Sequence, residues 1–146
     1  MLLVIDVGNT NTVVGVYEGD QLITNWRLST ERNRTIDEYG ILFRNLFTLA
    51  KMDSEKITGI AISSVVPPLN FTLTKMAENY FGLTPYYVDH SSDTGMPIRY
   101  SPVTDVGADR IVNSVAAIAR YGSPCIIVDF GTATTFDAVG KNNEYL

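Results

Sequence analysis

The sequence is short of cysteine, of basic residues and of long apolar runs, and each shortage excludes a class of protein. Cys125 is the only cysteine, so a disulfide framework within the chain is excluded, which favours a reducing compartment. No apolar run approaches the roughly 20 residues that span a bilayer. The opening residues, Met1 to Asp6, have no basic segment and reach a carboxylate at once, unlike a signal peptide. We therefore expect a cytoplasmic protein with no membrane partner.

The charge balance and two missing motifs narrow the ligands further. Lys and Arg total 11 and Asp and Glu total 16, so the net charge is 11 − 16 = −5. Because counterion release from nucleic acid requires many cations on one face, we expect no nucleic-acid partner. The sequence contains no G-x-x-x-x-G-K-[ST] loop, and no two of its glycines stand two residues apart, as G-x-G-x-x-G requires. A local pocket for a small phosphate ligand remains compatible with this composition.

What the chain does contain is 146 residues, 45% of them hydrophobic, arranged with clear periodicity. The periodicity predicts an α/β fold with a mixed sheet. Three strands joined by tight turns open the chain, and a helix, a strand, a second helix and a short strand follow. The predicted strands are 2–5, 13–17, 21–28, 57–63, 85–88, 124–128 and 136–139, and the predicted helices are 36–50, 67–80 and 105–121.

A polar segment at 89–106, which Gly95, Pro97 and Pro102 interrupt, is the predicted boundary inside the chain. It separates a first domain at 1–88 from the start of a second at 107–146. The last six residues are predicted to form a turn and the opening of another strand. Because a strand without partners is a liability, we expect this chain to be the N-terminal part of a longer protein.

One short motif occurs twice, each time at the end of a buried strand. Asp6-x-Gly8-Asn9 follows the first strand, and Asp129-x-Gly131-Thr132 follows a later one, at an offset of 129 − 6 = 123 residues. A carboxylate fixed at a strand end can hold a hydrated cation, and a glycine lets backbone N–H groups approach phosphate oxygens. A single copy is more typical of a hairpin turn with an Asx hydrogen bond. Two copies favour a pair of hairpins that grip a triphosphate.

A second motif, Gly107-Ala108-Asp109-Arg110, opens the predicted helix after the polar segment. It has two interpretations, and the spacing alone favours neither. Asp109 in the first turn stabilises the helix dipole, with Arg110 as a solvated neighbour. Alternatively the helix N–H groups and Arg110 bind a substrate carboxylate or amide, and Asp109 accepts a proton from a hydroxyl.

Four segments in sequence order resemble the motifs of type III pantothenate kinases, and the resemblance covers essentially the whole chain. They are Asp6-Val7-Gly8-Asn9-Thr10-Asn11-Thr12, Ser63-Ser64-Val65-Val66-Pro67, Gly107-Ala108-Asp109-Arg110 and Asp129-Phe130-Gly131-Thr132-Ala133-Thr134-Thr135. The resemblance implies an actin-like, acetate-kinase-like (ribonuclease H-like) ATPase fold with duplicated lobes, the second incomplete in this chain. It implies ATP-dependent phosphorylation of pantothenate to phosphopantothenate, the first step of coenzyme A biosynthesis.

The resemblance also implies roles for individual residues. Asp109 is the implied proton acceptor, and Asp129 the implied ligand of a monovalent cation, K⁺ or NH₄⁺. Asp6 is implied to lie near magnesium. The implied ATP-binding residues are Asp6, Val7, Gly8, Asn9, Thr10, Asn11, Thr12, Val13 and Thr132, and the implied pantothenate-binding residues are Tyr100, Gly107, Ala108, Asp109 and Arg110.

Members of this family are homodimers in which the neighbouring subunit completes the substrate pocket, so the resemblance implies a homodimer. The adenosine-contacting segment is implied to lie beyond Leu146, and we expect the isolated chain to be inactive or weakly competent. Two other functions stay open. One is a transcriptional accessory role like that of the Bvg accessory factors, through protein partners. The other is a non-catalytic, nucleotide-binding actin-like module.

Overall fold

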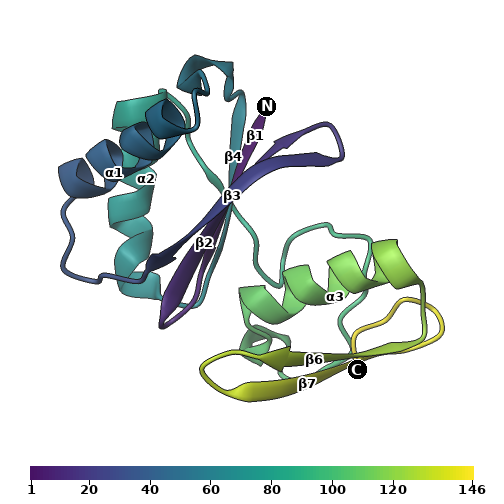
Figure 1. Cartoon of the computed structure of the whole chain (residues 1–146). Helices are drawn as coiled ribbons and strands as arrows, with labels where there is room; N and C mark the ends of the chain where they lie inside the picture. Colours follow the sequence, from purple (N-terminus) through teal and green to yellow (C-terminus); the bar gives the residue numbers. More distant parts are fainter. The chain divides into compact units, whose positions relative to one another are not determined.

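The computed structural model describes all residues from 1 to 146 and divides them into two compact units (Figure 1). Unit 1 comprises Met1–Tyr87, and unit 2 comprises Val88–Leu146. The polar segment 89–106 therefore belongs to the second unit, where Met96 and Val106 contribute buried side chains. No helix in either unit has the length and apolar content needed to cross a membrane.

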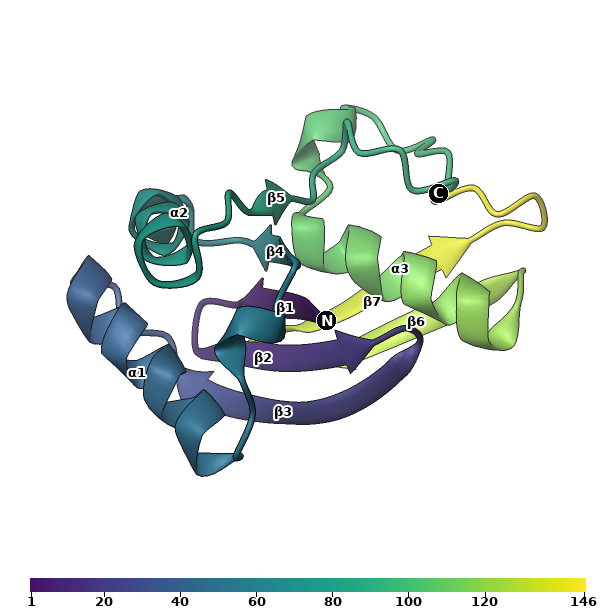
Figure 2. The same cartoon turned by 90° about the horizontal axis from the view of Figure 1, so that it is seen from above.

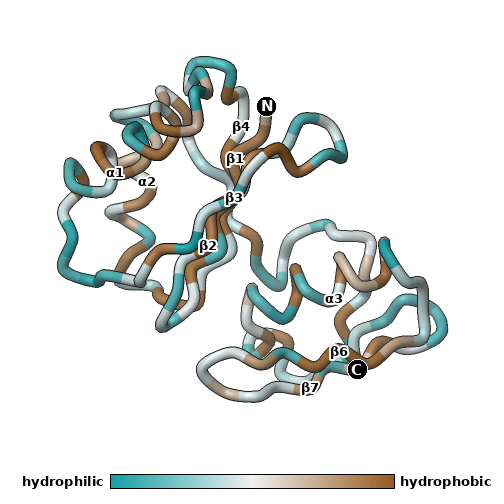
Figure 3. Tube along the Cα trace, in the orientation of Figure 1, coloured by the Kyte–Doolittle hydropathy of each residue, from teal (hydrophilic) through white to brown (hydrophobic).

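Unit 1 contains a five-stranded mixed sheet in the order β3-β2-β1-β4-β5. The first three strands are an antiparallel meander, and β4 and β5 continue the sheet parallel to β1. This topology confirms the predicted mixed sheet. In Figure 3 the apolar residues of β1 show as a brown stretch. The strands are β1 (Leu2–Val7), β2 (Asn11–Glu18), β3 (Gln21–Ser29), β4 (Gly59–Ser64) and β5 (Tyr86–Tyr87).

Two helices, α1 (Ile36–Leu49) and α2 (Pro67–Phe81), lie on the same side of this sheet (Figure 1). A capping box starts α1: the Thr35 hydroxyl accepts from the Glu38 N–H, and the Glu38 carboxylate accepts from the Thr35 N–H. A short 3-10 turn, η1 (Ser54–Lys56), follows α1. The helices bury their apolar faces with β1, β2 and β4 in one core, which includes Leu3, Ile5, Val14, Tyr39, Phe43, Phe47, Ile62, Leu69, Leu73 and Met76.

Gly40 marks the close approach of α1 to α2. It is buried, and a Cβ built on it would overlap the Tyr80 ring. We predict that Gly40→Ala lowers the free energy of unfolding by about 1–2 kcal/mol, because the overpacking outweighs the gain in helix propensity. In a Tyr80→Ala background the overlap is gone, and the same change should become stabilising. Urea unfolding followed by Trp26 fluorescence measures the effect in each background. Trp26 reports on α1 because its ring packs against the Phe47 ring, with centroids 5.7 Å apart. Equal effects in the two backgrounds would contradict this explanation.

Unit 2 packs one long helix against a hairpin, as Figure 2 shows from above. Its elements are η2 (Val103–Asp105), α3 (Ala108–Tyr121), β6 (Cys125–Phe130) and β7 (Thr134–Val139). β6 and β7 pair antiparallel, and a small core gathers Met96, Val106, Ile111 and Tyr145.

The last six residues form the predicted turn, and after it the chain pairs at a single residue rather than along a strand. Tyr145 forms isolated bridges with Ile98 and Val139. Its N–H donates to the Pro97 carbonyl at 2.8 Å, and its carbonyl accepts from the Arg99 N–H at 2.8 Å. The backbone bonds at this end of the chain are therefore shared between the loop before α3 and β7, where the Leu146 N–H donates to the Ala138 carbonyl at 3.0 Å.

Candidate functional site

The first predicted phosphate loop is the turn between β1 and β2. Asp6 is the penultimate residue of β1 and is exposed, and the turn runs from Gly8 to Asn11. The Gly8 N–H donates to the Asn11 carbonyl at 2.9 Å. A Cβ on Gly8 would lie only 3.0 Å from that same oxygen, so the tight turn favours glycine.

Two residues that sequence reasoning missed brace this loop from the end of β3. The Thr30 hydroxyl donates to the Gly8 carbonyl at 2.7 Å and lies 2.9 Å from the Thr12 hydroxyl. Arg32 donates to the Asn9 side-chain oxygen at 3.1 Å. Thr12 is buried, so its side chain stabilises the loop from inside. The signal in the sequence was indirect: an antiparallel meander brings the end of β3 beside the β1–β2 turn.

The second predicted loop repeats this geometry in unit 2. Asp129 is the penultimate residue of β6, as Asp6 is of β1, and an antiparallel strand follows each. The Gly131 N–H donates to the Ala133 carbonyl at 3.2 Å, the counterpart of the bond at Gly8. Thr132 is exposed at the tip of this turn. Both copies of the motif therefore fold into hairpins, but the loops differ by one residue: Val7 pairs with Thr12 in the first, and Phe130 pairs with Thr134 in the second. That they face one another across a cleft stays a prediction.

The start of α3 carries the second motif. Gly107 is the N-cap with an extended backbone, and the Asp109 carboxylate accepts from the Arg110 N–H at 2.8 Å. This bond fits an acid in the first turn of a helix, where N–H groups lack intrahelical partners. Both Asp109 and Arg110 are half-buried, so each retains access to the surface of unit 2.

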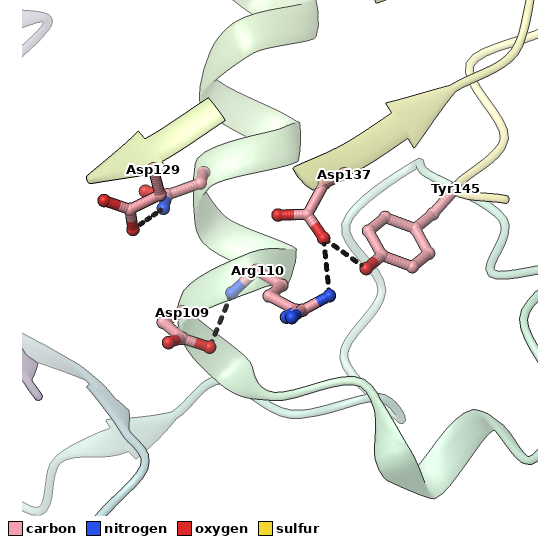
Figure 4. A network of polar contacts seen from close by, with 6 residues as sticks. Asp109, Arg110, Asp129, Asp137 and Tyr145 are labelled. Carbon is pink, nitrogen blue, oxygen red and sulfur yellow. Dashed lines mark hydrogen bonds and ion pairs between the residues drawn. The ribbon is translucent and has the colours of Figure 1, made fainter. Parts of the chain in front are cut away.

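A buried polar network surrounds this helix start (Figure 4). The Arg110 guanidinium donates to the Asp137 carboxylate at 3.0 Å, and the Tyr145 hydroxyl donates to the same oxygen at 2.6 Å. Burial raises the pKa of Tyr145, and its bond to Asp137 raises that pKa further, so the hydroxyl keeps its proton. The Tyr100 ring meets the Tyr145 ring edge-on, with centroids 6.5 Å apart.

Asp129 is tied to the same helix one turn further along. The Asn113 side-chain amide donates to the Asp129 carboxylate at 3.2 Å, across from β6 to α3. Unit 2 therefore brings together the Asp109, Arg110, Tyr100 and Asp129 predicted from sequence. Sequence reasoning missed Asn113, Asp137 and Tyr145. For Asp137 the signal was a carboxylate at an inward-facing position of an apolar strand, in register with the buried Val139.

The carboxylates predicted to hold cations, Asp6 and Asp129, are not part of a cluster of metal-ligating side chains. No group of three or more His, Cys, Asp or Glu side chains that could hold a metal exists in the chain. A hard cation at Asp6 or Asp129 would therefore take one carboxylate from the protein and its remaining oxygen ligands from phosphates, water and backbone carbonyls. At Asp6 that donor set suits Mg²⁺ bound together with a nucleotide.

Comparison with known proteins decides the family. The family model for type III pantothenate kinases matches residues 2–146. The chain belongs to the type III pantothenate kinase family.

Two relatives carry the family name and align over the whole chain. The type III pantothenate kinase of Koribacter versatilis (strain Ellin345) is 56% identical over 156 residues, covering 100% of this chain and 57% of the relative. That of Myxococcus xanthus (strain DK1622) is 56% identical over 146 residues, with the same coverage. The chain thus spans somewhat more than half the length of the curated relatives it matches.

Solved structures show the same fold at low sequence identity. The Lmo2764 protein from Listeria monocytogenes matches with a TM-score of 0.52 at 14% identity, covering 99% of this chain and 48% of that one. A ROK hexokinase from Thermus thermophilus matches with a TM-score of 0.50 at 13% identity, covering 99% and 47%. The type III pantothenate kinase chain therefore has the actin-like ATPase fold, as its sequence predicted.

Proposed function

We propose that the intact protein transfers the γ-phosphoryl group of ATP to the primary hydroxyl of pantothenate, the first step of coenzyme A biosynthesis. The observation that carries this proposal is the start of α3 in a chain of this family. There the half-buried carboxylate of Asp109 stands next to Arg110. The Arg110 guanidinium is in turn held by the buried Asp137 carboxylate, with 3.0 Å between Nη1 and Oδ1. Asp109 is suited to accept the hydroxyl proton, and Arg110 to bind the carboxylate or amide of pantothenate.

In this proposal the two hairpins bind the nucleotide. The turn from Gly8 to Asn11 offers backbone N–H groups and short polar side chains to phosphate oxygens, and the turn at Thr132 offers the same from the second unit. Magnesium bound with ATP would offset triphosphate charge, with Asp6 beside it, and Asp129 would hold K⁺ or NH₄⁺. Because phosphoryl transfer has a loose transition state, alignment and charge neutralisation carry most of the catalysis.

The remaining proposals concern the whole protein. We infer a cytoplasmic homodimer whose neighbouring subunit completes the pantothenate pocket. The face of β6 and β7 with Ile126, Val128, Phe130 and Phe136 is exposed. Since the chain spans only 57% of the length of these relatives, we infer that second-lobe residues of the intact protein cover this face. The isolated chain is accordingly expected to be inactive or weakly active.

The experiment that tests the function is a coupled assay of ADP release by the intact protein, with ATP and with pantothenate added or left out. Pantothenate-dependent ADP release is the expected result, with phosphopantothenate as the second product. ADP release at the same rate without pantothenate would contradict the proposal. It would favour a nucleotide-binding module without this transferase activity.

We predict that the same reaction depends on the identity of the monovalent cation. With Asp129 intact, replacing K⁺ by Na⁺ at constant ionic strength should lower the rate several-fold, because a smaller cation fits the same oxygen ligands poorly. In an Asp129→Asn variant the rate should be low in both salts. Equal wild-type rates in the two salts would remove the cation assignment and leave the kinase proposal standing.

A further inference from the structure

Asp137 is a buried carboxylate, and a contribution to folding stability does not explain why it is buried. Its side chain is 1% exposed. On β7 it lies two residues from Val139, which is also buried. Its hydrogen bonds from Arg110 and from Tyr145 both go to Oδ1, whereas Oδ2 is buried and has no hydrogen-bond partner. A buried charge that is only partly satisfied costs stability relative to an apolar residue of the same size. This cost points to a role for Asp137 outside folding.

Asp137 has two partners: Arg110, which reaches the surface of unit 2, and Tyr145, which is buried. Arg110 has a side chain that is 38% exposed, so the guanidinium reaches the surface while Asp137 fixes one of its nitrogens from below. Guanidinium groups carry five N–H donors in a rigid fork. With Nη1 committed to Asp137 and the Tyr145 hydroxyl beside the guanidinium, the orientation of the fork is set, and its exposed side can meet a planar carboxylate or amide.

Tyr145 connects this pair to the loop before α3. Two backbone hydrogen bonds of 2.8 Å hold it there: its N–H donates to the Pro97 carbonyl, and its carbonyl accepts from the Arg99 N–H. Its hydroxyl reaches the Asp137 carboxylate at 2.6 Å, and its ring packs edge-on against the Tyr100 ring at an interplanar angle of 70°. The Tyr145 side chain therefore contacts both Asp137, which supports Arg110, and the Tyr100 ring.

We propose that Asp137 and Tyr145 are positioning residues of the substrate pocket, which together orient the Arg110 guanidinium and the Tyr100 ring toward pantothenate. This inference rests on the proposed function, because Arg110 and Tyr100 are the groups expected to touch the substrate. Neither Asp137 nor Tyr145 takes part in the transfer itself. Their effect passes through Arg110 and Tyr100 and is geometric.

Two variants of the intact protein test this role. Tyr145→Phe keeps the ring and removes only the hydroxyl, and Asp137→Asn keeps the side-chain volume and removes the charge. Because small displacements of a positioning group weaken binding strongly, we expect the KM for pantothenate to rise about tenfold in each. The KM for ATP should stay within about twofold, since the nucleotide hairpins are unchanged. Tyr87→Phe is the matched control: it removes a hydroxyl that bonds the Asn70 carbonyl at 2.8 Å in unit 1.

A double-mutant cycle separates positioning from a general structural effect. In an Arg110→Gln background the guanidinium is absent and only the path through Tyr145 to Tyr100 is left, so adding Asp137→Asn should raise the pantothenate KM by clearly less than it does in the wild type. Calorimetric titration with pantothenate provides the same comparison without turnover.

The outcomes separate the two hypotheses. If the wild type releases ADP with pantothenate but both variants keep its KM, this inference is overturned. The same holds if kcat and both KM values change together, or if Asp137→Asn acts fully in the Arg110→Gln background. If the wild type neither binds pantothenate nor turns over, the proposed function fails and this inference falls with it.

Discussion

Asp109→Asn is expected to reduce the pantothenate-dependent rate of ADP release by about 10²- to 10⁴-fold, the contribution typical of a general base. The amide has the shape of the carboxylate, and its oxygen can still accept from the Arg110 N–H, a bond that spans 2.8 Å in the wild type. The start of α3 should therefore keep its structure. What the variant loses is the ability to take the hydroxyl proton. We expect kcat to fall while both KM values change little.

The control for this change is Asp93→Asn, the same replacement at an exposed position of the polar loop in unit 2. It should leave the rate within about twofold of the wild type, as expected for a surface charge outside the site. Thermal unfolding of Asp109→Asn should match the wild type, which separates lost chemistry from lost structure. A rate for Asp109→Asn equal to that of the wild type would remove Asp109 as the proton acceptor.

The local features of the fold could be predicted from the sequence because they depend on neighbours in the chain. Thr35 and Glu38 stand three residues apart, and this spacing of a hydroxyl and an acid is enough to indicate where α1 begins. The matching positions of Asp6 and Asp129 followed in the same way from two apolar strands, each with an acid near its end.

The supports of the site depend on contacts between distant residues, and these escaped the sequence. Thr30 reaches Gly8 across 22 residues, and Asp137 reaches Arg110 across 27. Each contact depends on strand register and on how a helix packs against a hairpin, which no local pattern specifies. Gly40 is a similar case. In the sequence it is a weak helix former inside a helix, and only the Tyr80 ring of α2 explains it.

Truncating the centre of the first core should have the largest effect on stability. Phe43 lies on α1, is 0% exposed, and packs edge-on against Tyr39 with centroids 6.5 Å apart. We expect Phe43→Ala to lower the free energy of unfolding by about 3–5 kcal/mol, because the truncation loses apolar contact and leaves a cavity in a packed core. Phe43→Leu keeps most of the volume and should cost less than about 1.5 kcal/mol.

The same helix provides the control for Phe43. Ile41 is 56% exposed, so Ile41→Ala removes an apolar side chain of similar chemistry from the solvent side and should change stability by no more than about 0.5 kcal/mol. Urea unfolding followed by Trp26 fluorescence reports on this core through the contact with Phe47. Hydrogen exchange of the α1 amides should show the same order of stabilities. A loss in Ile41→Ala as large as in Phe43→Ala would mean that α1 turns a different face to the sheet.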